Sequence, residues 1–174
     1  GRGVKILQDA NIQVEVGLLE DEASELNRGF GKRMQTGMPF VTSKIAMSLD
    51  GRTAMKNGES KWITSDAARK DVHKLRSENQ AIMTGSGTII NDNPMMTVRL
   101  NEIDSNPLRV IIDSGNVIND KSLNIFSSNA DTLVLNSDNS KTLSNGKLDL
   151  QSALIKLGEM GVNNLLLEAG SGLN

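Results

Sequence analysis

The residues best suited to chemistry gather between positions 41 and 64, in the run VTSKIAMSLDGRTAMKNGESKWIT. Its first half alternates apolar and polar residues as a strand does, and Asp50-Gly51 predicts a turn. A strand that carries Lys44, followed by a loop with the only tryptophan, Trp62, is typical of the mouth of a ligand pocket. The alternative is a buried strand, a solvated turn and a core tryptophan, which composition alone favours.

The overall composition excludes several kinds of site. The chain has no cysteine, so it holds neither disulfides nor thiolate metal sites, and one histidine, His73, cannot form a histidine cluster. We expect His73 at a solvated helix position. A net charge of -2 gives no general attraction to nucleic acid or membranes, and no apolar run reaches the ~20 residues of a membrane helix. A cytoplasmic protein with a small-molecule partner is expected, and its oligomeric state is left open.

Apolar periodicity predicts alternating helices and strands, hence an α/β sheet. The motif Gly85-Ser86-Gly87-Thr88 follows a strand but lacks the third glycine of a Rossmann fingerprint, and Pro94 prevents the long crossover helix. Helices are expected over 4–10, over 19–34, after an N-cap at Thr64 or Ser65, and from Leu150 to just before Gly161. Strands are expected over 12–16, from Val41 to the turn at Asp50, and over 81–84, 108–113, 131–136 and 164–168.

Five motifs in order resemble the reductase domain of the bifunctional riboflavin-biosynthesis deaminase/reductase. They are SLDGRTA, GESKWIT, TGSGTIINDNP, PLRVIIDS and LLLEAGSG. The resemblance implies a dihydrofolate-reductase-like mixed sheet flanked by helices and C-terminally incomplete. It also implies that residues 1–38 are the tail of the deaminase domain with its linker, and that residues 39–174 are a truncated reductase domain.

The activity implied by the resemblance is NADPH-dependent reduction of 5-amino-6-(5-phosphoribosylamino)uracil. Hydride reaches the sugar carbon bonded to the amine, and the product carries an open ribityl chain. The deaminase would need zinc held by His and Cys side chains, so we expect no deaminase activity from this chain. Two alternatives stay open: a related reductase that acts before deamination, and a non-catalytic remnant that binds a nucleotide.

The resemblance also assigns site residues, some of which have a physical reason of their own. Ser114 follows a strand end, where a hydroxyl suits the 2′-phosphate of NADPH, and the amides of 170–172 suit a pyrophosphate. Lys44 is expected near the reacting centre because of its place on the strand, and no metal is expected. The implied substrate residues are Ser60, Arg76, Met96, Arg99 and Glu168, and the implied cofactor residues are Ala46, Trp62, Thr64, Thr88, Asp92, Ser114, Gly170, Ser171 and Gly172.

The ends of the sequence lead to a further expectation. The chain stops two residues after a glycine turn whose physical use is to open a helix onto a phosphate. We therefore expect a fragment with weak or absent reductase activity, restored when the natural downstream sequence is added.

Overall fold

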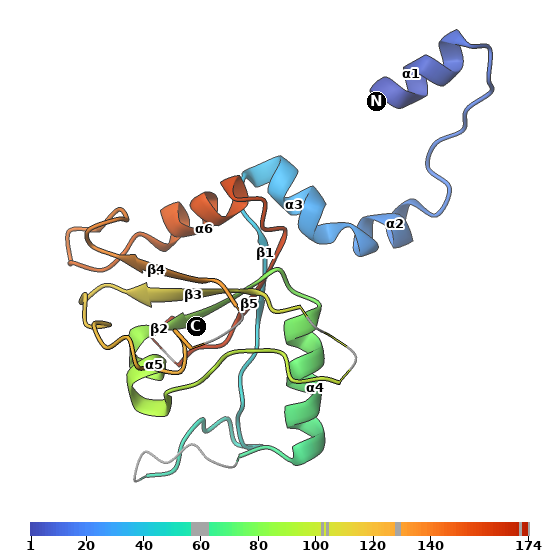
Figure 1. The fold of residues 1–174 in the computed structure, drawn as a ribbon. Coiled ribbons are helices and arrows are strands. Elements are labelled where there is room, and N and C mark those ends of the chain that lie inside the picture. Colours follow the sequence, from blue (N-terminus) through green and yellow to red (C-terminus); the bar gives the residue numbers. More distant parts are fainter. Residues whose placement is uncertain (57–62, 102, 104, 128–129, 171, 174) are drawn as a thin grey trace.

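A five-stranded parallel sheet forms the centre of the molecule in the computed structural model, which describes residues 1–56, 63–101, 103, 105–127, 130–170 and 172–173 (Figure 1). The strand order is β1-β5-β2-β3-β4, and each neighbouring pair is parallel. Antiparallel pairing within the described part is limited to an isolated bridge between Thr142 and Leu148. The α/β class is confirmed. The strands are β1 Phe40–Ser43, β2 Ala81–Gly85, β3 Leu108–Asp113, β4 Thr132–Asn136 and β5 Asn164–Leu167.

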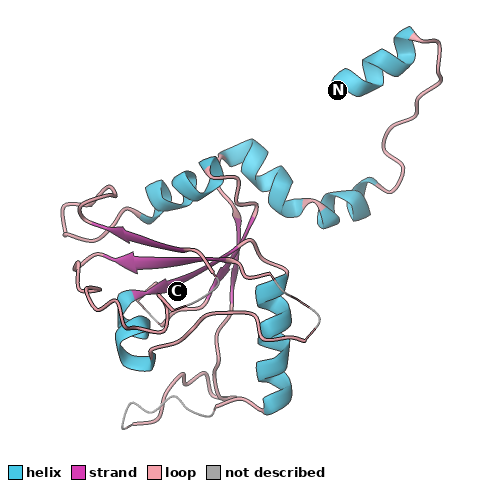
Figure 2. Ribbon diagram, in the orientation of Figure 1, coloured by secondary structure: helices cyan, strands magenta, loops and turns pink. Residues whose placement is uncertain are grey.

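Helices cover both faces of this sheet, so the main body has three layers (Figure 2). In Figure 1, α3 and α6 lie on the upper side of the sheet, and α4 and α5 lie on the lower side. Each face has its own apolar cluster, one with Leu157 of α6 and one with Ile89 of α5. The helices are α1 Arg2–Asp9, α2 Glu20–Leu26, α3 Arg28–Thr36, α4 Asp66–Ser77, α5 Ser86–Asp92 and α6 Leu150–Glu159.

The central strands are buried on both faces, which is why their sequences are continuous apolar runs. In β2, Ala81 and Met83 belong to the cluster under α6, whereas Ile82 belongs to the cluster under α5. Successive side chains thus alternate between the two cores, as the strand period requires. The predicted strands over 81–84, 108–113, 131–136 and 164–168 are confirmed within one residue at each end.

The N-terminal arm differs from the prediction. Residues 12–16 form no strand, and Val16 is 81% exposed. The expected helix over 19–34 is two helices that meet at Asn27, and its apolar stripe is exposed, with Leu26 at 87%. Apolar periodicity shows only that a segment is amphipathic. A strand also needs a neighbour that shares its backbone hydrogen bonds, and no described strand pairs with residues 12–16. The helix over 4–10 is confirmed as α1, although it buries no residue.

The elements around the predicted pocket follow local rules. Ser65 is the N-cap of α4, and its hydroxyl accepts a hydrogen bond from the Ala68 amide at 3.3 Å. α5 has only seven residues and ends before Pro94, so the exclusion of a Rossmann fold is confirmed. Strand β1 ends at Ser43, earlier than expected, and the turn at Gly51 is present with φ of 79°. None of the helices in the described ranges has the length and apolar character to cross a membrane.

Candidate active site

A cavity of about 550 Å³ opens at the carboxyl ends of β1 and β5. Ligands of open α/β sheets bind at this edge. The walls come from the residues after β1, from α4 and α5, from residues 94–96, and from the residues after β5. This cavity brings together eight of the predicted site residues: Lys44, Ala46, Arg76, Thr88, Asp92, Met96, Glu168 and Gly170.

The other predicted residues divide into two groups. Ser60, Trp62 and Ser171 lie outside the described residues, so their assignments stay predictions. The remaining four residues are described but do not line this cavity: Thr64, Arg99, Ser114 and Gly172. The Ser114 hydroxyl accepts a hydrogen bond from the Leu148 amide at 3.1 Å.

Sheet register places two charged side chains next to each other. Ser43 of β1 pairs with Leu167 of β5, so the residues that follow, Lys44 and Glu168, leave the sheet side by side. The Lys44 amide still donates to the Leu167 carbonyl at 2.9 Å, which fixes its backbone at the sheet edge. The Lys44 Nζ atom then lies 3.7 Å from the Glu168 Oε2 atom.

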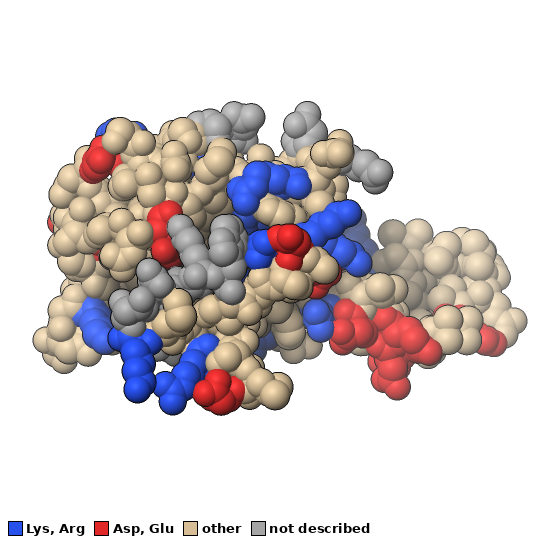
Figure 3. All heavy atoms as spheres, turned by 90° about the horizontal axis from the view of Figure 1, so that it is seen from below, with Lys and Arg blue, Asp and Glu red and all other residues tan. Residues whose placement is uncertain are grey.

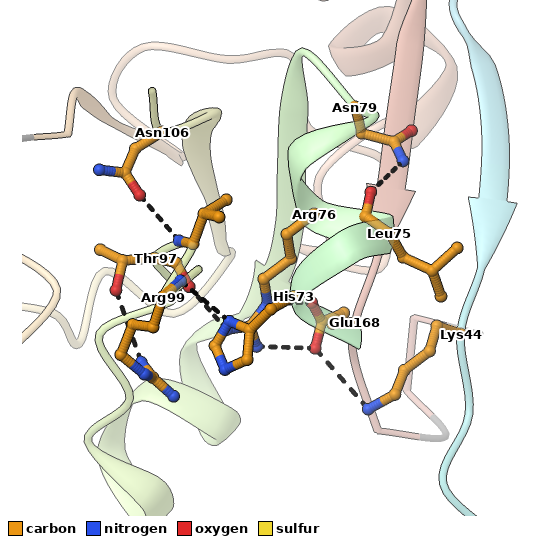
Figure 4. Close-up of polar contacts among 10 residues, drawn as sticks. Lys44, His73, Leu75, Arg76, Asn79, Thr97, Arg99, Asn106 and Glu168 are labelled. Carbon is orange, nitrogen blue, oxygen red and sulfur yellow. Dashed lines mark hydrogen bonds and ion pairs between the residues drawn. The ribbon is translucent and has the colours of Figure 1, made fainter. Parts of the chain in front are cut away.

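Arg76 projects from α4, the helix on the lower side of the sheet in Figure 1, and completes this group (Figure 4). Its Nε and Nη2 atoms donate to the two carboxylate oxygens of Glu168 at 2.6 and 3.0 Å, and its Nη1 atom donates to the Thr97 carbonyl at 3.1 Å. The two side chains are only 12% and 10% exposed. The pair is therefore held in a planar two-point geometry and shielded from water, which makes it rigid.

His73 was expected in solvent, and the structure contradicts that expectation. Its ring is half-buried, and its Nδ1 atom accepts a hydrogen bond from the Arg99 amide at 3.2 Å. Burial, with the nearby charges of Arg99 and Arg76, lowers the pKa of His73, although Glu168 and a hydrogen bond with the Thr97 backbone act in the opposite direction. His73 lies one helical turn before Arg76, so the two side chains share one face of α4.

Positive charge exceeds negative charge around this group. Among the described residues, Lys44, Arg76 and Arg99 lie around the carboxylate of Glu168, with Asp92 as a second carboxylate on the cavity wall, and burial together with the charge of Arg76 lowers the pKa of Arg99. Figure 3 shows Lys and Arg side chains gathered on the lower face of the main body, whereas acidic side chains gather on the N-terminal arm. Such a surplus favours an anionic ligand. No group of three or more His, Cys, Asp or Glu in the described ranges could hold a metal ion.

Comparison with known sequences identifies relatives over the whole chain. The sequence model of a family described as the RibD C-terminal domain matches residues 39–174. The riboflavin biosynthesis protein RibD of Escherichia coli (strain K12) is 39% identical over 193 residues, which cover 98% of this chain and 53% of that protein. The same protein of Haemophilus influenzae is 40% identical and matches 100% of this chain and 52% of its own length. The chain thus spans about half the length of these curated relatives.

Solved structures give the same result. A diaminohydroxyphosphoribosylaminopyrimidine deaminase/5-amino-6-(5-phosphoribosylamino)uracil reductase from Thermotoga maritima matches with a TM-score of 0.87 and 35% identity, over 99% of this chain and 51% of its own. Acinetobacter baumannii RibD matches with a TM-score of 0.85 and 39% identity, over the same shares. The riboflavin biosynthesis reductase Rib7 of Saccharomyces cerevisiae is 18% identical, covers 87% of this chain and 73% of its own, and with a TM-score of 0.61 supports the fold alone.

Proposed function

The chain belongs to the family of the RibD C-terminal domain, and on that premise we propose that it is an NADPH-dependent reductase of a phosphoribosylamino-pyrimidine. The substrate class is taken from the name of the T. maritima neighbour, a 5-amino-6-(5-phosphoribosylamino)uracil reductase. One observation carries the proposal: a fixed Arg76–Glu168 pair with Lys44 beside it on the wall of a cavity of about 550 Å³. That volume lies in the range of about 300–1,000 Å³ typical of small-molecule sites.

The charged groups suit the two ends of such a substrate. A phosphate monoester carries a charge of about -1.5 to -2 at neutral pH. Arg99 is the better phosphate ligand, because within the described residues its guanidinium makes one long hydrogen bond, a 3.5 Å donation to the Thr97 hydroxyl, whereas Arg76 already donates three hydrogen bonds. Glu168 is an acceptor for the N–H groups of the pyrimidine, and Arg76 holds its carboxylate in one orientation. Ser60 and Met96 complete the proposed substrate contacts.

The cavity also has the chemistry that a nicotinamide cofactor needs. Ala46 and Gly170 leave room on its wall, and Thr88 and Asp92 of α5 offer hydrogen-bonding groups to the cofactor hydroxyls. Bound NADPH supplies the hydride for the reduction. We assign the 2′-phosphate to Ser114, because a hydroxyl whose oxygen accepts from the Leu148 amide can still donate its hydrogen to a phosphate oxygen. Trp62, Thr64, Ser171 and Gly172 complete the proposed cofactor contacts.

When the ribose ring opens, the bond between the sugar carbon and the ring oxygen breaks, the proton of the amine passes to that oxygen, and a C=N bond forms. Reduction then places a hydride on the carbon of this C=N bond and a proton on its nitrogen. Lys44 is the proposed proton donor because its ammonium group lines the cavity and Glu168 holds it at 3.7 Å. A positioned acid contributes about 10²–10⁴-fold to such a step. The other proposed site residues bind and orient the substrate and the cofactor and exclude water.

The test compares Lys44→Met with Lys44→Arg in an NADPH-oxidation assay with 5-amino-6-(5-phosphoribosylamino)uracil. Lys44→Met is expected to lower kcat by about 10²-fold or more, with NADPH affinity unchanged, because it removes the proposed proton donor and keeps a side chain of similar length. Calorimetric titration supplies the NADPH and NADH affinities, and NADPH is expected to bind more tightly. Binding of NADPH without turnover by the unaltered chain would instead support a nucleotide-binding module. Faster turnover of the corresponding diaminopyrimidine would support a reductase that acts before deamination.

A further inference from the structure

A stretch of irregular backbone forms one wall of the cavity. This cavity-wall segment, residues 93–100, has no regular secondary structure and contributes Pro94 and Met96 to the lining. Met96 is buried and has a φ of 52°, in the left-handed region that few side chains adopt. Because a buried irregular backbone cannot satisfy its own polar groups, other elements must hold it in place.

Helix α4 supplies two of these restraints from one face. Arg76 donates to the Thr97 carbonyl at 3.1 Å, and His73 accepts from the Arg99 amide at 3.2 Å, so the two side chains hold the backbone on either side of Val98. From the opposite side, the Asn106 side-chain oxygen accepts from the Val98 amide at 2.8 Å. Figure 4 shows the His73 and Arg76 side chains reaching the backbone of Thr97 and Arg99.

We propose that His73 is a positioning residue that acts through Arg99: its neutral ring fixes the Arg99 backbone so that the guanidinium meets the substrate phosphate, and protonation of the ring releases it. This inference rests on the proposed function, because it assigns the substrate phosphate to Arg99. It adds a residue that none of the sequence motifs places in the site. His73 itself touches neither substrate nor cofactor in this arrangement.

The chemistry of imidazole makes this contact dependent on protonation. Nδ1 can accept a hydrogen bond only when the ring is neutral with its hydrogen on Nε2, since both nitrogens of the charged ring are donors. In the charged ring an N–H group would face the Arg99 N–H group. The charged groups that face the ring are Arg76 on α4, Arg99 in the cavity-wall segment and Glu168 after β5. Burial and the two arginines lower the pKa of His73 and outweigh Glu168 and the hydrogen bond with the Thr97 backbone, so the surroundings favour the neutral ring that the contact requires.

Simple electrostatics predicts the opposite change in phosphate affinity as the pH falls, and this difference makes the proposal testable. A protonated His73 adds positive charge close to Arg99, which alone would tighten phosphate binding as pH falls. Loss of the hydrogen bond would instead weaken it. The substrate phosphate itself titrates near pH 6, so a pH profile of the unaltered protein alone cannot separate the two effects. A variant that keeps an acceptor but cannot titrate removes that ambiguity.

The experiment therefore compares His73→Asn, whose amide oxygen can occupy the place of Nδ1, with His73→Leu, which has no acceptor. At pH 8 we expect His73→Leu to raise the KM for the phosphorylated substrate by up to about tenfold, as loss of one hydrogen bond allows. The kcat and the NADPH affinity are expected to stay the same, and His73→Asn is expected to keep the normal KM. Between pH 7.5 and 5.5, the KM of the unaltered protein should rise more than that of His73→Asn.

A second measurement is independent of turnover. In ¹⁵N NMR spectra of the unaltered chain, the Arg99 amide is expected to shift with the protonation of His73, at a pH below the ordinary value of about 6.5. In His73→Asn this shift should be absent. If the chain proves not to be a reductase, the same titration with inorganic phosphate as probe still tests the link between His73 and Arg99.

Three results would overturn the proposal. The first is a normal KM in His73→Leu, and the second is an Arg99 amide that does not follow the titration of His73. The third is a KM of the unaltered protein that decreases, relative to that of His73→Asn, as the pH is lowered. Such a decrease would mean that the added positive charge of His73 controls phosphate binding. Failure of reduction with an intact Arg99 titration would count against the proposed function alone.

Discussion

The guanidinium of Arg76 and the carboxylate of Glu168 meet at two points, at 2.6 and 3.0 Å, although 92 residues separate them in the chain. Arg76 reaches this position from the last turn of α4, whereas Glu168 reaches it from just beyond the end of β5. Both side chains are almost fully covered. The pair therefore connects α4 to the carboxyl edge of the sheet and determines the shape of the cavity between them.

Glu168→Gln is expected to destabilise the fold. It leaves the shielded Arg76 cation without its counter-charge, and removal of one partner of a buried pair costs about 3–5 kcal/mol. Because the amide oxygen still accepts one hydrogen bond, the expected loss in unfolding free energy is at the low end, about 3 kcal/mol. Urea denaturation measures it. Glu78→Gln, at the exposed C-terminus of α4, is the matched control and should stay within about 0.5 kcal/mol. Equal losses in the two variants would show that the pair contributes nothing specific.

Two glycines of α3 should respond to alanine in opposite directions. At Gly29 an added Cβ would collide with the Asn164 side chain and come within 2.9 Å of the Asn163 carbonyl, whereas at Gly31 nothing lies within 4 Å. Alanine in a helix is favoured over glycine by up to about 1 kcal/mol. Gly31→Ala should therefore stabilise the protein by about that amount, and Gly29→Ala should destabilise it. Thermal unfolding of the two variants checks this, and stabilisation by both would contradict the close packing of α3 on β5.

Local rules of sequence predicted most of the sheet. The strands over 81–84 and 108–113 are buried on both faces, so their apolar runs are unambiguous, and the Ser65 cap and the break before Pro94 depend only on neighbouring residues. The strand over 12–16 failed for the reason that makes β structure hard to predict. Its alternation is real, but a strand exists only where a neighbour accepts its hydrogen bonds.

The arrangement of the site residues in space could not be predicted from their spacing in the sequence. The contact between Lys44 and Glu168 follows from the register of β1 on β5, and no local pattern specifies that register. Arg109 is a second example. It lies within an apolar strand, yet it is 1% exposed and donates to the Met95 carbonyl at 3.0 Å and to the Ala130 carbonyl. A buried arginine that holds two loops cannot be distinguished by sequence alone from an exposed edge residue.

Ser65→Ala tests how much of α4 depends on its cap. The Ser65 hydroxyl accepts from the Ala68 amide, and loss of such a cap costs about 1 kcal/mol. The expected result is a decrease of that size in unfolding free energy, measured by denaturation with urea. Ser65→Asp keeps an acceptor and places negative charge at the helix N-terminus, so it should retain most of the stability. A decrease of the same size in Ser65→Asp would mean that the cap is not the cause.

Asp149, the N-cap of α6, should give the fold a pH dependence that an asparagine removes. Its carboxylate accepts from the side chain and amide of Ser152 and pairs with Lys141 at 3.2 Å, and these contacts lower its pKa. A carboxyl whose pKa is lower in the folded state stabilises the fold fully above its ordinary value, about 3.9, and this contribution is lost as pH falls through the lower folded value. Asp149→Asn still caps the helix but cannot titrate, so its unfolding free energy should fall less than that of the unaltered protein between pH 5 and 2.

Unfolding curves of Asp149→Asn and the unaltered protein across that pH range measure the difference. The control is Asp9→Asn, at the exposed end of α1. Parallel pH profiles for Asp149→Asn and the unaltered protein would show that the hydrogen bonds at this cap do not favour the charged carboxylate.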